Sequence, residues 1–301
     1  MRPACPHCQT HSDQPQGDQI FWRGHYFRAC DRTWIRRYRC GRCRRSFSSS
    51  TTDVFRRTRR RDLHKVMPQL LSYGLTLRGL AHVFGASRTT IARKLRLLGA
   101  IARADFATEL ADLKPLQVIQ FDEMETFEHT KWKPLSIATA VCENTRRILG
   151  FEVARMPARG LYAKRACEKY GRRRDGRARA RRKLLRRLAP KLTSLGLIKS
   201  DKNPGYPPLI REILPRIEHQ RFKGRRACTI GQGELKRGGF DPLFSFNHTA
   251  AMIRAHVSRL VRQTWCTTKK IPSLEDHLYI YANFHNNELL TLNQRCKSTC
   301  S

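Results

Sequence analysis

Two short apolar segments that each end in an aspartate constrain the fold of this 301-residue chain more than any other feature. The first reads LQVIQFD, residues 116–122, and the second reads LGLIKSD, residues 195–201. Runs of this length and composition are typical of buried strands. If the two strands pair, Asp122 and Asp201 lie side by side. Two adjacent carboxylates can form a binding site for divalent cations. The sequence therefore predicts a sheet that carries a metal site.

The chain is strongly basic. It has 60 Lys and Arg against 24 Asp and Glu, a formal net charge of +36. Most of these residues are Arg, whose guanidinium group binds phosphates and bases through paired hydrogen bonds. Such an excess is the electrostatic signature of nucleic-acid binding, so the substrate expected at the aspartates is a phosphate backbone.

Hydropathy and cysteine usage bear on where the protein works. No run of about 18 apolar residues is present, which predicts a chain without a membrane span. The first residues, MRPAC, lack the apolar core of a signal peptide. We therefore expect a cytoplasmic protein, in which the 11 cysteines are thiols or metal ligands rather than disulfides.

Residues 1–47 contain two Cys-x-x-Cys motifs, formed by Cys5 and Cys8 and by Cys40 and Cys43. Four thiolates from two such motifs complete the tetrahedral cage of structural zinc. Alternating aromatic and basic residues between the motifs indicate the strands of a zinc ribbon, a domain so small that it needs its metal to fold. Candidates to replace one of the four ligands are Cys30, His7 and His11. The alternative interpretation is a redox pair or unligated thiols.

Residues 48–62 are rich in Ser, Thr and Arg, and we expect them to form a flexible linker. Helical spacing begins at Leu63, and Thr76 and Ser87 are candidate N-caps of a second and a third helix within residues 63–104. This pattern predicts a helix-turn-helix domain whose third helix enters the major groove. The residues expected to face DNA are Arg88, Thr89, Thr90, Arg93 and Lys94. An ordinary three-helix element with a solvated basic surface is the alternative.

Residues 112–301 read as a sheet with helices. The expected strands are residues 116–122, 135–141, 148–153, 195–201 and 221–223. Helices are expected over residues 206–214 and 247–265, and a basic helical insert over residues 160–194. The insert is interpreted as a clamp on the DNA backbone, or alternatively as a solvated, partly disordered loop. The expected backbone contacts are Arg172, Arg173, Arg174, Arg181 and Arg182, with Lys269 beyond the last helix.

Several segments of this region are similar to the transposases of insertion sequences. They are IQFDE at 119–123, GQGELK at 231–236, NHTAAMIR at 247–254 and RLVRQTWCTTK at 259–269. The order of zinc ribbon, helix-turn-helix and catalytic core also matches that family. The resemblance implies a multidomain chain of mixed α+β and α/β class. Its core would be an RNase H-like, mixed five-stranded sheet flanked by helices, with the first and fourth strands as neighbours.

The resemblance also implies a mechanism. Two ions, Mg²⁺ or Mn²⁺, would be held by Asp122, Asp201 and a third residue at the head of the last helix, usually Glu and sometimes Asn. By its place in the chain the third residue is Asn247, and Glu234 and Glu275 are the alternatives. One ion would activate water or a 3′-hydroxyl, and the other would stabilise the leaving oxygen.

The function implied is that of a bacterial DNA transposase associated with the nucleoid. It would bind terminal inverted repeats, cleave one strand and join a 3′-hydroxyl to target DNA, as a homodimer or a higher oligomer. Two other hypotheses stay open: a catalytically inactive, transposase-derived DNA-binding regulator, and a metal-dependent DNA nuclease. Strand-joined products would distinguish the first function from the other two.

Overall fold

The computed structural model describes residues 3–9, 20–56, 58–224, 235–236, 239–261 and 265–291. The chain forms two compact units, residues 1–67 and residues 68–301, and each is described by itself. Within the described ranges, every helix is too short or too polar to cross a membrane.

The first unit is built on an antiparallel sheet in the order β1-β2-β3. Its strands are β1 (Ile20–Arg28), β2 (Thr33–Cys40) and β3 (Ser46–Ser48). At one end of the sheet, Ile20, Tyr38 and Phe47 pack with two of the cysteines into a small apolar cluster. The first two strands lie where the alternation of aromatic and basic residues predicted them, whereas β3 was not predicted because three residues give no periodic signal.

The segment predicted to be a flexible linker is partly fixed to the hairpin of β1 and β2. The hydroxyls of Tyr26 and Ser50 lie 3.0 Å apart, and Ser50 is buried. The guanidinium of Arg61 donates to Asp53 at 2.7 Å. Composition predicted flexibility here, but these polar side chains find partners within the unit.

Three helices follow the linker segment along the chain. They are α1 (Leu63–Ser72), α2 (Leu77–Val83) and α3 (Arg88–Asp112). The predicted caps are confirmed, because Thr76 accepts from the Gly79 amide at 3.0 Å and Ser87 accepts from the Thr90 amide at 3.1 Å. Gly85 takes a left-handed conformation, φ +55°, in the turn before α3.

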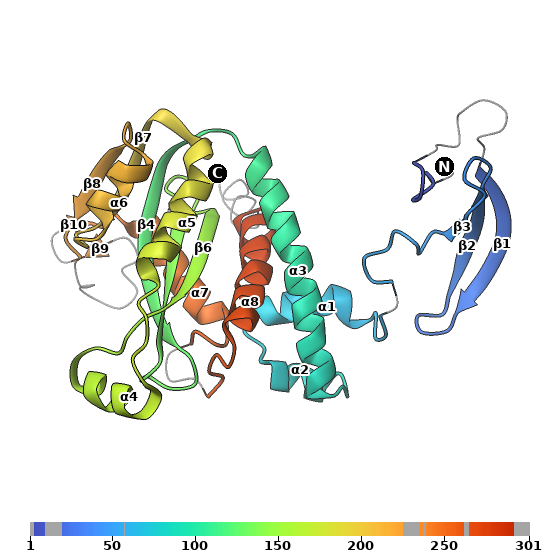
Figure 1. Ribbon diagram of the computed structural model, residues 1–301, viewed down its shortest axis with the longest axis horizontal. Helices are drawn as coiled ribbons and strands as arrows, with labels where there is room; N and C mark the ends of the chain where they lie inside the picture. The colour runs from blue at the N-terminus through green and yellow to red at the C-terminus, as the bar shows by residue number, and fades with distance from the viewer. Residues whose placement is uncertain are drawn as a thin grey trace. The chain divides into compact units, whose positions relative to one another are not determined.

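The helix α3 is longer than predicted, since it continues to Asp112 and packs along α8 (Ile271–Phe284). Figure 1 shows these two helices side by side. Phe106 and Tyr279 meet edge to face at the contact, with ring centroids 5.6 Å apart. The helix therefore belongs to the same compact unit as the large sheet.

A mixed five-stranded sheet forms the centre of the second unit (Figure 1). Its strands are β4 (Leu116–Phe127), β5 (Pro134–Cys142), β6 (Ile148–Arg155), β7 (Leu192–Asp201) and β8 (Glu218–Phe222). They lie in the order β6-β5-β4-β7-β8, with β4–β5 and β5–β6 antiparallel and β4–β7 and β7–β8 parallel. The expected mixed five-stranded sheet is confirmed, including the adjacency of its first and fourth strands.

Helices cover both faces of this sheet. On one face lie α5 (Arg177–Leu188) and α6 (Tyr206–Ile213), whose apolar side chains pack on Phe121 and Ile198. The other face carries α7 (Phe244–His256), which is hydrogen-bonded to β4. Shorter elements complete the described chain. They are α4 (Ala163–Tyr170), the two-residue strands β9 (Leu235–Lys236) and β10 (Gly239–Phe240), the 3-10 turns Gly160–Tyr162 and Ala189–Lys191, and the π-turn His285–Leu289.

Two predicted helical regions differ from the structure. The last long helix, predicted over residues 247–265, is α7, which begins at Phe244 and ends at His256, where Val257 takes an extended conformation. The basic region 160–194 is not an insert as a whole, because α5 is the crossover between β6 and β7. Its Leu184, Leu185 and Leu188 are fully buried against the sheet. High charge concealed this apolar stripe in the sequence.

Candidate active site

The register of β4 and β7 brings the two predicted aspartates together. In this parallel pair Phe121 lies opposite Ser200, so that Asp122 and Asp201 are the next residues along the two strands. Side chains alternate along a strand, and Asp122 therefore shares a face with Gln120, which bonds to α7. By this alternation both carboxylates leave the sheet on the face that carries α7, at a strand end where groups from the opposite face also reach them.

The position of Asp122 within its strand differs from the prediction. We expected Asp122 to end a strand, but β4 continues to Phe127, whereas β7 does end at Asp201. Asp122 pairs with Thr139 of β5 on its other side. The polar residues after Asp122 concealed the second half of β4, which is stabilised by its pairing with β5. The pair of aspartates thus lies where the shorter strand stops beside the longer one.

The electrostatics of the pair favour a cation. Burial raises the pKa of Asp122 to about 7, and the negative charge of Asp201 adds to this effect. Two carboxylates in a partly desolvated setting repel each other, and a bound divalent ion supplies the missing positive charge. The donor set of two hard carboxylate groups suits Mg²⁺ or Mn²⁺.

A tyrosine hydroxyl orients Asp122. The phenol of Tyr206, in the first turn of α6, donates to Oδ1 of Asp122 at 3.1 Å and lies 3.5 Å from Oε2 of Glu123. Its ring is fully buried and meets Phe121 edge to face, with centroids 5.0 Å apart. Burial and the charge of Asp122 raise the pKa of Tyr206 well above its ordinary value, so the phenol stays protonated and remains a donor.

Glu123 points to the opposite face of the sheet, where it has two further partners. Arg181 of α5 donates to its Oε2, and the hydroxyl of Ser136 donates to its Oε1 at 2.8 Å. The guanidinium of Arg181 also lies over the Tyr206 ring, 4.9 Å from its centroid. Arg181, Glu123 and Tyr206 therefore form one buried support beneath the carboxylate pair. Sequence reasoning missed this group because its members come from three separate elements.

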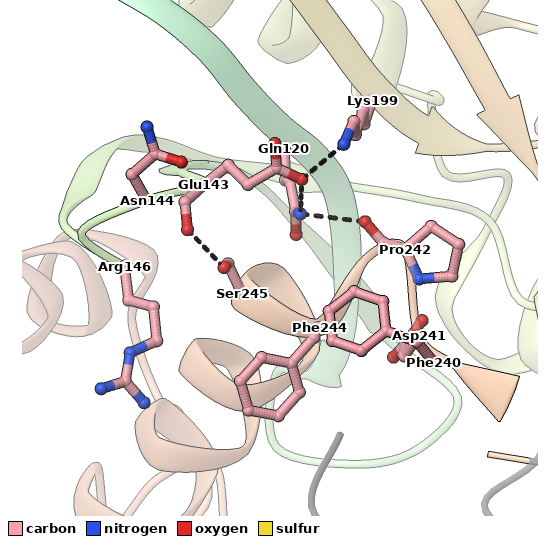
Figure 2. Close-up of a pocket in the computed structure, with 10 residues that line it drawn as sticks. All are labelled: Gln120, Glu143, Asn144, Arg146, Lys199, Phe240, Asp241, Pro242, Phe244 and Ser245. Carbon is pink, nitrogen blue, oxygen red and sulfur yellow. Dashed lines mark hydrogen bonds and ion pairs between the residues drawn. The ribbon is translucent and has the colours of Figure 1, made fainter. Parts of the chain in front are cut away.

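The first turn of α7 is fixed to β4 on the carboxylate face. The side chain of Gln120 accepts from the Phe246 amide at 2.7 Å. It also donates to the Pro242 carbonyl at 3.0 Å, as Figure 2 shows. Asn247, in the same turn, donates from Nδ2 to Oδ2 of Asp241 at 2.7 Å. The predicted third residue therefore lies on the helix that is fixed to β4 through Gln120, and it is hydrogen-bonded to Asp241.

The other two candidates for the third position differ in what the structure shows. Glu275 lies on α8, where its carboxylate is 3.6 Å from Arg103 of α3. Burial raises its pKa. The sheet contact of α8 is with β6, two strands away from β4. Glu234 lies outside the described residues.

Asp201 borders a groove of about 520 Å³ that is rich in positive charge. The cationic side chains that line it are Arg159, Arg177, Arg181, Lys202 and Lys223. Cations beside a carboxylate pair suit a substrate whose phosphates pass the pair. A second cavity, of about 640 Å³, lies by Gln120 on the α7 face (Figure 2). There Glu143 accepts from Lys199 at 2.7 Å and from Gln120 at 2.8 Å.

Two of the predicted DNA contacts are buried in this structure. Lys94 on α3 is 6% exposed, and Arg181 is 7% exposed and bonded to Glu123. Two others are engaged within the protein: Arg173 is 3.5 Å from Glu128, and Arg182 is 2.9 Å from Glu212. The remaining predicted contacts lie at least partly exposed on the surface. They are Arg88, Thr89, Thr90, Arg93, Arg172, Arg174 and Lys269.

The four predicted zinc ligands converge in the first unit. Their Sγ atoms all lie within 4.8 Å of one another, with Cys5–Cys43 at 3.6 Å and Cys8–Cys40 at 3.5 Å. A tetrahedral zinc ion with Zn–S bonds of about 2.3 Å needs sulfur atoms about 3.8 Å apart, so the cluster fits the metal. The spare candidates Cys30 and His7 are exposed and outside this cluster, and His11 lies outside the described residues.

Comparison with known proteins gave no family model that matches the chain and no matching curated protein. Among solved structures, the catalytic domain of Mos1 mariner transposase is 13% identical, over 66% of this chain and 91% of that chain, with a TM-score of 0.29. The Mos1 mariner paired end complex with Mn is 10% identical, over 72% of each chain, with a TM-score of 0.27. The simian T-cell lymphotropic virus intasome in complex with PP2A regulatory subunit B56 gamma is 11% identical, over 72% of this chain and 64% of that chain, with a TM-score of 0.26. Identity and TM-score are low in all three cases, and the function of the chain is therefore argued from its own residues.

Proposed function

We propose that the chain is a DNA transposase of the insertion-sequence type, which cleaves DNA strands and joins a 3′-hydroxyl to target DNA with two divalent ions. The observation that carries the proposal is the parallel pairing of β4 with β7, which sets Asp122 beside Asp201. The pKa of Asp122, raised to about 7, and the cationic groove beside Asp201 support it. A carboxylate pair that attracts metal, next to cations that attract phosphate, suits phosphodiester chemistry.

In this proposal Asp122 and Asp201 hold the ions, Mg²⁺ or Mn²⁺. When bound, the ions lower the pKa of the attacking water or 3′-hydroxyl and neutralise the charge that develops on the leaving oxygen. Tyr206 occupies one oxygen of Asp122 as a hydrogen-bond donor, which leaves the second oxygen for a cation. Arg181, which is paired with Glu123, lies over the ring of Tyr206 and keeps the tyrosine in place.

Asn247 is our candidate for the third ligand. The hydrogen bond from its Nδ2 to Asp241 fixes the amide, and its carbonyl oxygen is not used in that bond. An amide oxygen ligates hard cations without adding charge. Glu234 remains the second candidate from the sequence. Glu275 is the weakest of the three, because it faces α3 and Arg103.

We further propose that the groove cations Arg159, Lys202 and Lys223 bind the phosphate backbone of double-stranded DNA. The exposed residues of the first two turns of α3, Arg88, Thr89 and Arg93, would contact the transposon ends. Zinc in the cysteine cluster would hold the first unit together. Because two ends must be brought together, the active form would be a homodimer or a higher oligomer.

The test is strand transfer by the purified protein, with DNA that flanks its own gene and with Mg²⁺ or Mn²⁺. Asp122→Asn and Asp201→Asn should each abolish joined products while DNA binding is retained. Asp105→Asn, an exposed aspartate on α3, is the matched control and should leave the products unchanged. Among Asn247→Ala, Glu234→Ala and Glu275→Ala, loss of metal-dependent product would identify the third ligand.

Two outcomes would replace the proposal. Cleaved but never joined DNA would indicate a metal-dependent nuclease. Tight, salt-sensitive binding of the ends without any cleavage would indicate a regulator that has lost its chemistry. Cleavage that survives both aspartate substitutions would show that the active site lies elsewhere.

A further inference from the structure

The hairpin of β1 and β2 displays an unusual number of exposed rings. Trp34 is 67% exposed, Trp22 is 58% exposed and Phe27 is 50% exposed. Large apolar side chains of this kind are normally buried, and a cluster of them at a surface marks a binding site. Neither the zinc cluster nor the carboxylate pair uses these rings.

The strand register places several of these groups on one face. Phe27 lies opposite Trp34, and His25 lies opposite Arg36. Directly opposed residues of an antiparallel pair share a face, as do alternate residues along a strand. The Phe27 and Trp34 rings are 5.4 Å apart. A register shift after Trp22 brings its ring to 5.2 Å from His25. We call this set of five residues the aromatic face.

The other face of the same hairpin is covered at Ile35, but it also carries two exposed rings, Phe21 at 50% and Tyr26 at 37%. Tyr26 and Ile35 are opposed there, and Ile35 is 5% exposed. The segment after β3 lies over this side, with the Tyr26 and Ser50 hydroxyls 3.0 Å apart. Toward the zinc cluster, Tyr38 is covered by Phe47, which stacks on it at 5.5 Å. Among the described residues of the hairpin, the two tryptophans, Trp34 and Trp22, are the most exposed rings, so the aromatic face is the more open of the two.

The charge around these rings indicates what they bind. Residues 20–47 contain nine arginines against a single acidic residue, Asp31. Arg36 itself belongs to the aromatic face and is exposed. A surface that combines exposed rings with guanidinium groups is complementary to a nucleic acid, whose bases stack on rings and whose phosphates pair with arginine.

We propose that the aromatic face binds unpaired nucleotides, with bases stacked on Trp34, Phe27 and Trp22 and with Arg36 at the backbone. Paired bases in a duplex show only their edges in the grooves, so flat rings gain little from a duplex. Bases of a single strand offer both of their flat surfaces. This assignment is independent of the chemistry at Asp122, since it concerns binding in the first unit.

The experiment measures equilibrium binding of the full-length, zinc-loaded protein to three DNA probes by fluorescence anisotropy. The probes are a 15-nucleotide oligo-dT, a blunt duplex and the same duplex with a single-stranded fork. An Asp122→Asn background without Mg²⁺ prevents cleavage. The variants are Trp34→Ala, Phe27→Ala and Trp34→Phe, and Val54→Ala is the control because Val54 is 64% exposed in the same unit but outside the aromatic face. Zinc content and size by light scattering verify that each variant is folded.

Each alanine variant should weaken binding of oligo-dT and of the fork at least about five-fold, since one stacked base contributes about 1–3 kcal/mol. Binding of the blunt duplex should change less than two-fold. Trp34→Phe should retain most of the affinity because it keeps a ring, and the control should behave as the parent.

Three results would overturn the proposal. Equal losses on single-stranded and duplex probes would show that the aromatic face contacts a duplex. Unchanged affinity on every probe would exclude nucleic acid from this face. Unchanged affinity with an altered oligomeric state would identify the aromatic face as a contact between proteins. None of these results depends on whether the protein cleaves or joins DNA, so they are separable from a failure of the proposed catalytic function.

Discussion

Asp122→Asn should stabilise the metal-free protein at neutral and alkaline pH. Asp122 has a pKa of about 7 in the folded chain, because it is buried beside Asp201. In the unfolded chain its pKa is about 3.9. Between about pH 4 and pH 7 the unfolded state ionises first, so the free energy of unfolding of the wild type falls as the pH rises through this window. Asparagine keeps the size of the side chain and does not ionise.

The size of the effect follows from the two pKa values. They differ by about three units, and each unit corresponds to about 1.4 kcal/mol. The advantage of the asparagine variant should therefore be near zero at pH 4 and should grow to at most about 4 kcal/mol above pH 7. Carboxyl groups remote from Asp122 cancel in the comparison because both proteins contain them, whereas relief of the repulsion with Asp201 is part of the expected gain.

Urea denaturation, followed by circular dichroism, measures this difference at pH 5, 6, 7 and 8. Zinc is kept in place and Mg²⁺ and Mn²⁺ are left out. Asp105→Asn is the control for loss of a charge from a basic protein, and its difference from the wild type should stay constant over the range. Mn²⁺ added at pH 8 should then stabilise the wild type and leave Asp122→Asn unchanged. A stabilisation of equal size at pH 5 and pH 8 would refute the reasoning, because it would not come from the ionisation of this carboxyl.

Three further substitutions test the supports of the carboxylate pair and of the cysteine cluster. Tyr206→Phe should weaken Mn²⁺ binding about ten-fold by calorimetry, because hydrogen bonds to charged groups contribute about 1.5–3 kcal/mol; unchanged affinity would remove the tyrosine from the site. Arg181→Met should lower the free energy of unfolding by about 3–5 kcal/mol, since it leaves Glu123 buried without its cation, and adding Glu123→Gln should recover most of the loss in urea titrations. Cys43→Ser should lose zinc by elemental analysis and expose the first unit to trypsin, whereas Cys30→Ser should keep both zinc and resistance; equal zinc loss in the two variants would contradict the assigned ligands.

Features encoded in a few adjacent residues were predictable from the sequence. The convergence of the four cysteines was predictable because each Cys-x-x-Cys motif directs two thiolates to one point. Thr76 and Ser87 were predicted as caps since their hydroxyls bond to amides three residues ahead. The adjacency of β4 and β7 followed from the strand order that the resemblance implied.

Features that depend on the direction of a side chain were not predictable. The arginines of α5 look alike in the sequence, yet Arg181 turns inward to Glu123, 58 residues earlier in the chain, while Arg186 is exposed. The hydroxyl of Tyr206 reaches a carboxylate 84 residues away. Net charge records how many cations a chain has, but only the fold decides which of them remain available to DNA.

The register between β4 and β7 makes the carboxylate pair sensitive to chain length. Inserting or deleting one residue between Leu197 and Asp201 would turn the aspartate to the α5 face, because strand side chains alternate. The apolar contacts that hold the two strands would survive in part, so such a chain would still fold and still carry its basic surface. Length changes in the exposed segment 171–176, which joins α4 to α5, would leave the pair aligned. If the proposed function holds, a change of one codon in β7 would convert a strand-cleaving enzyme into a protein that only binds DNA.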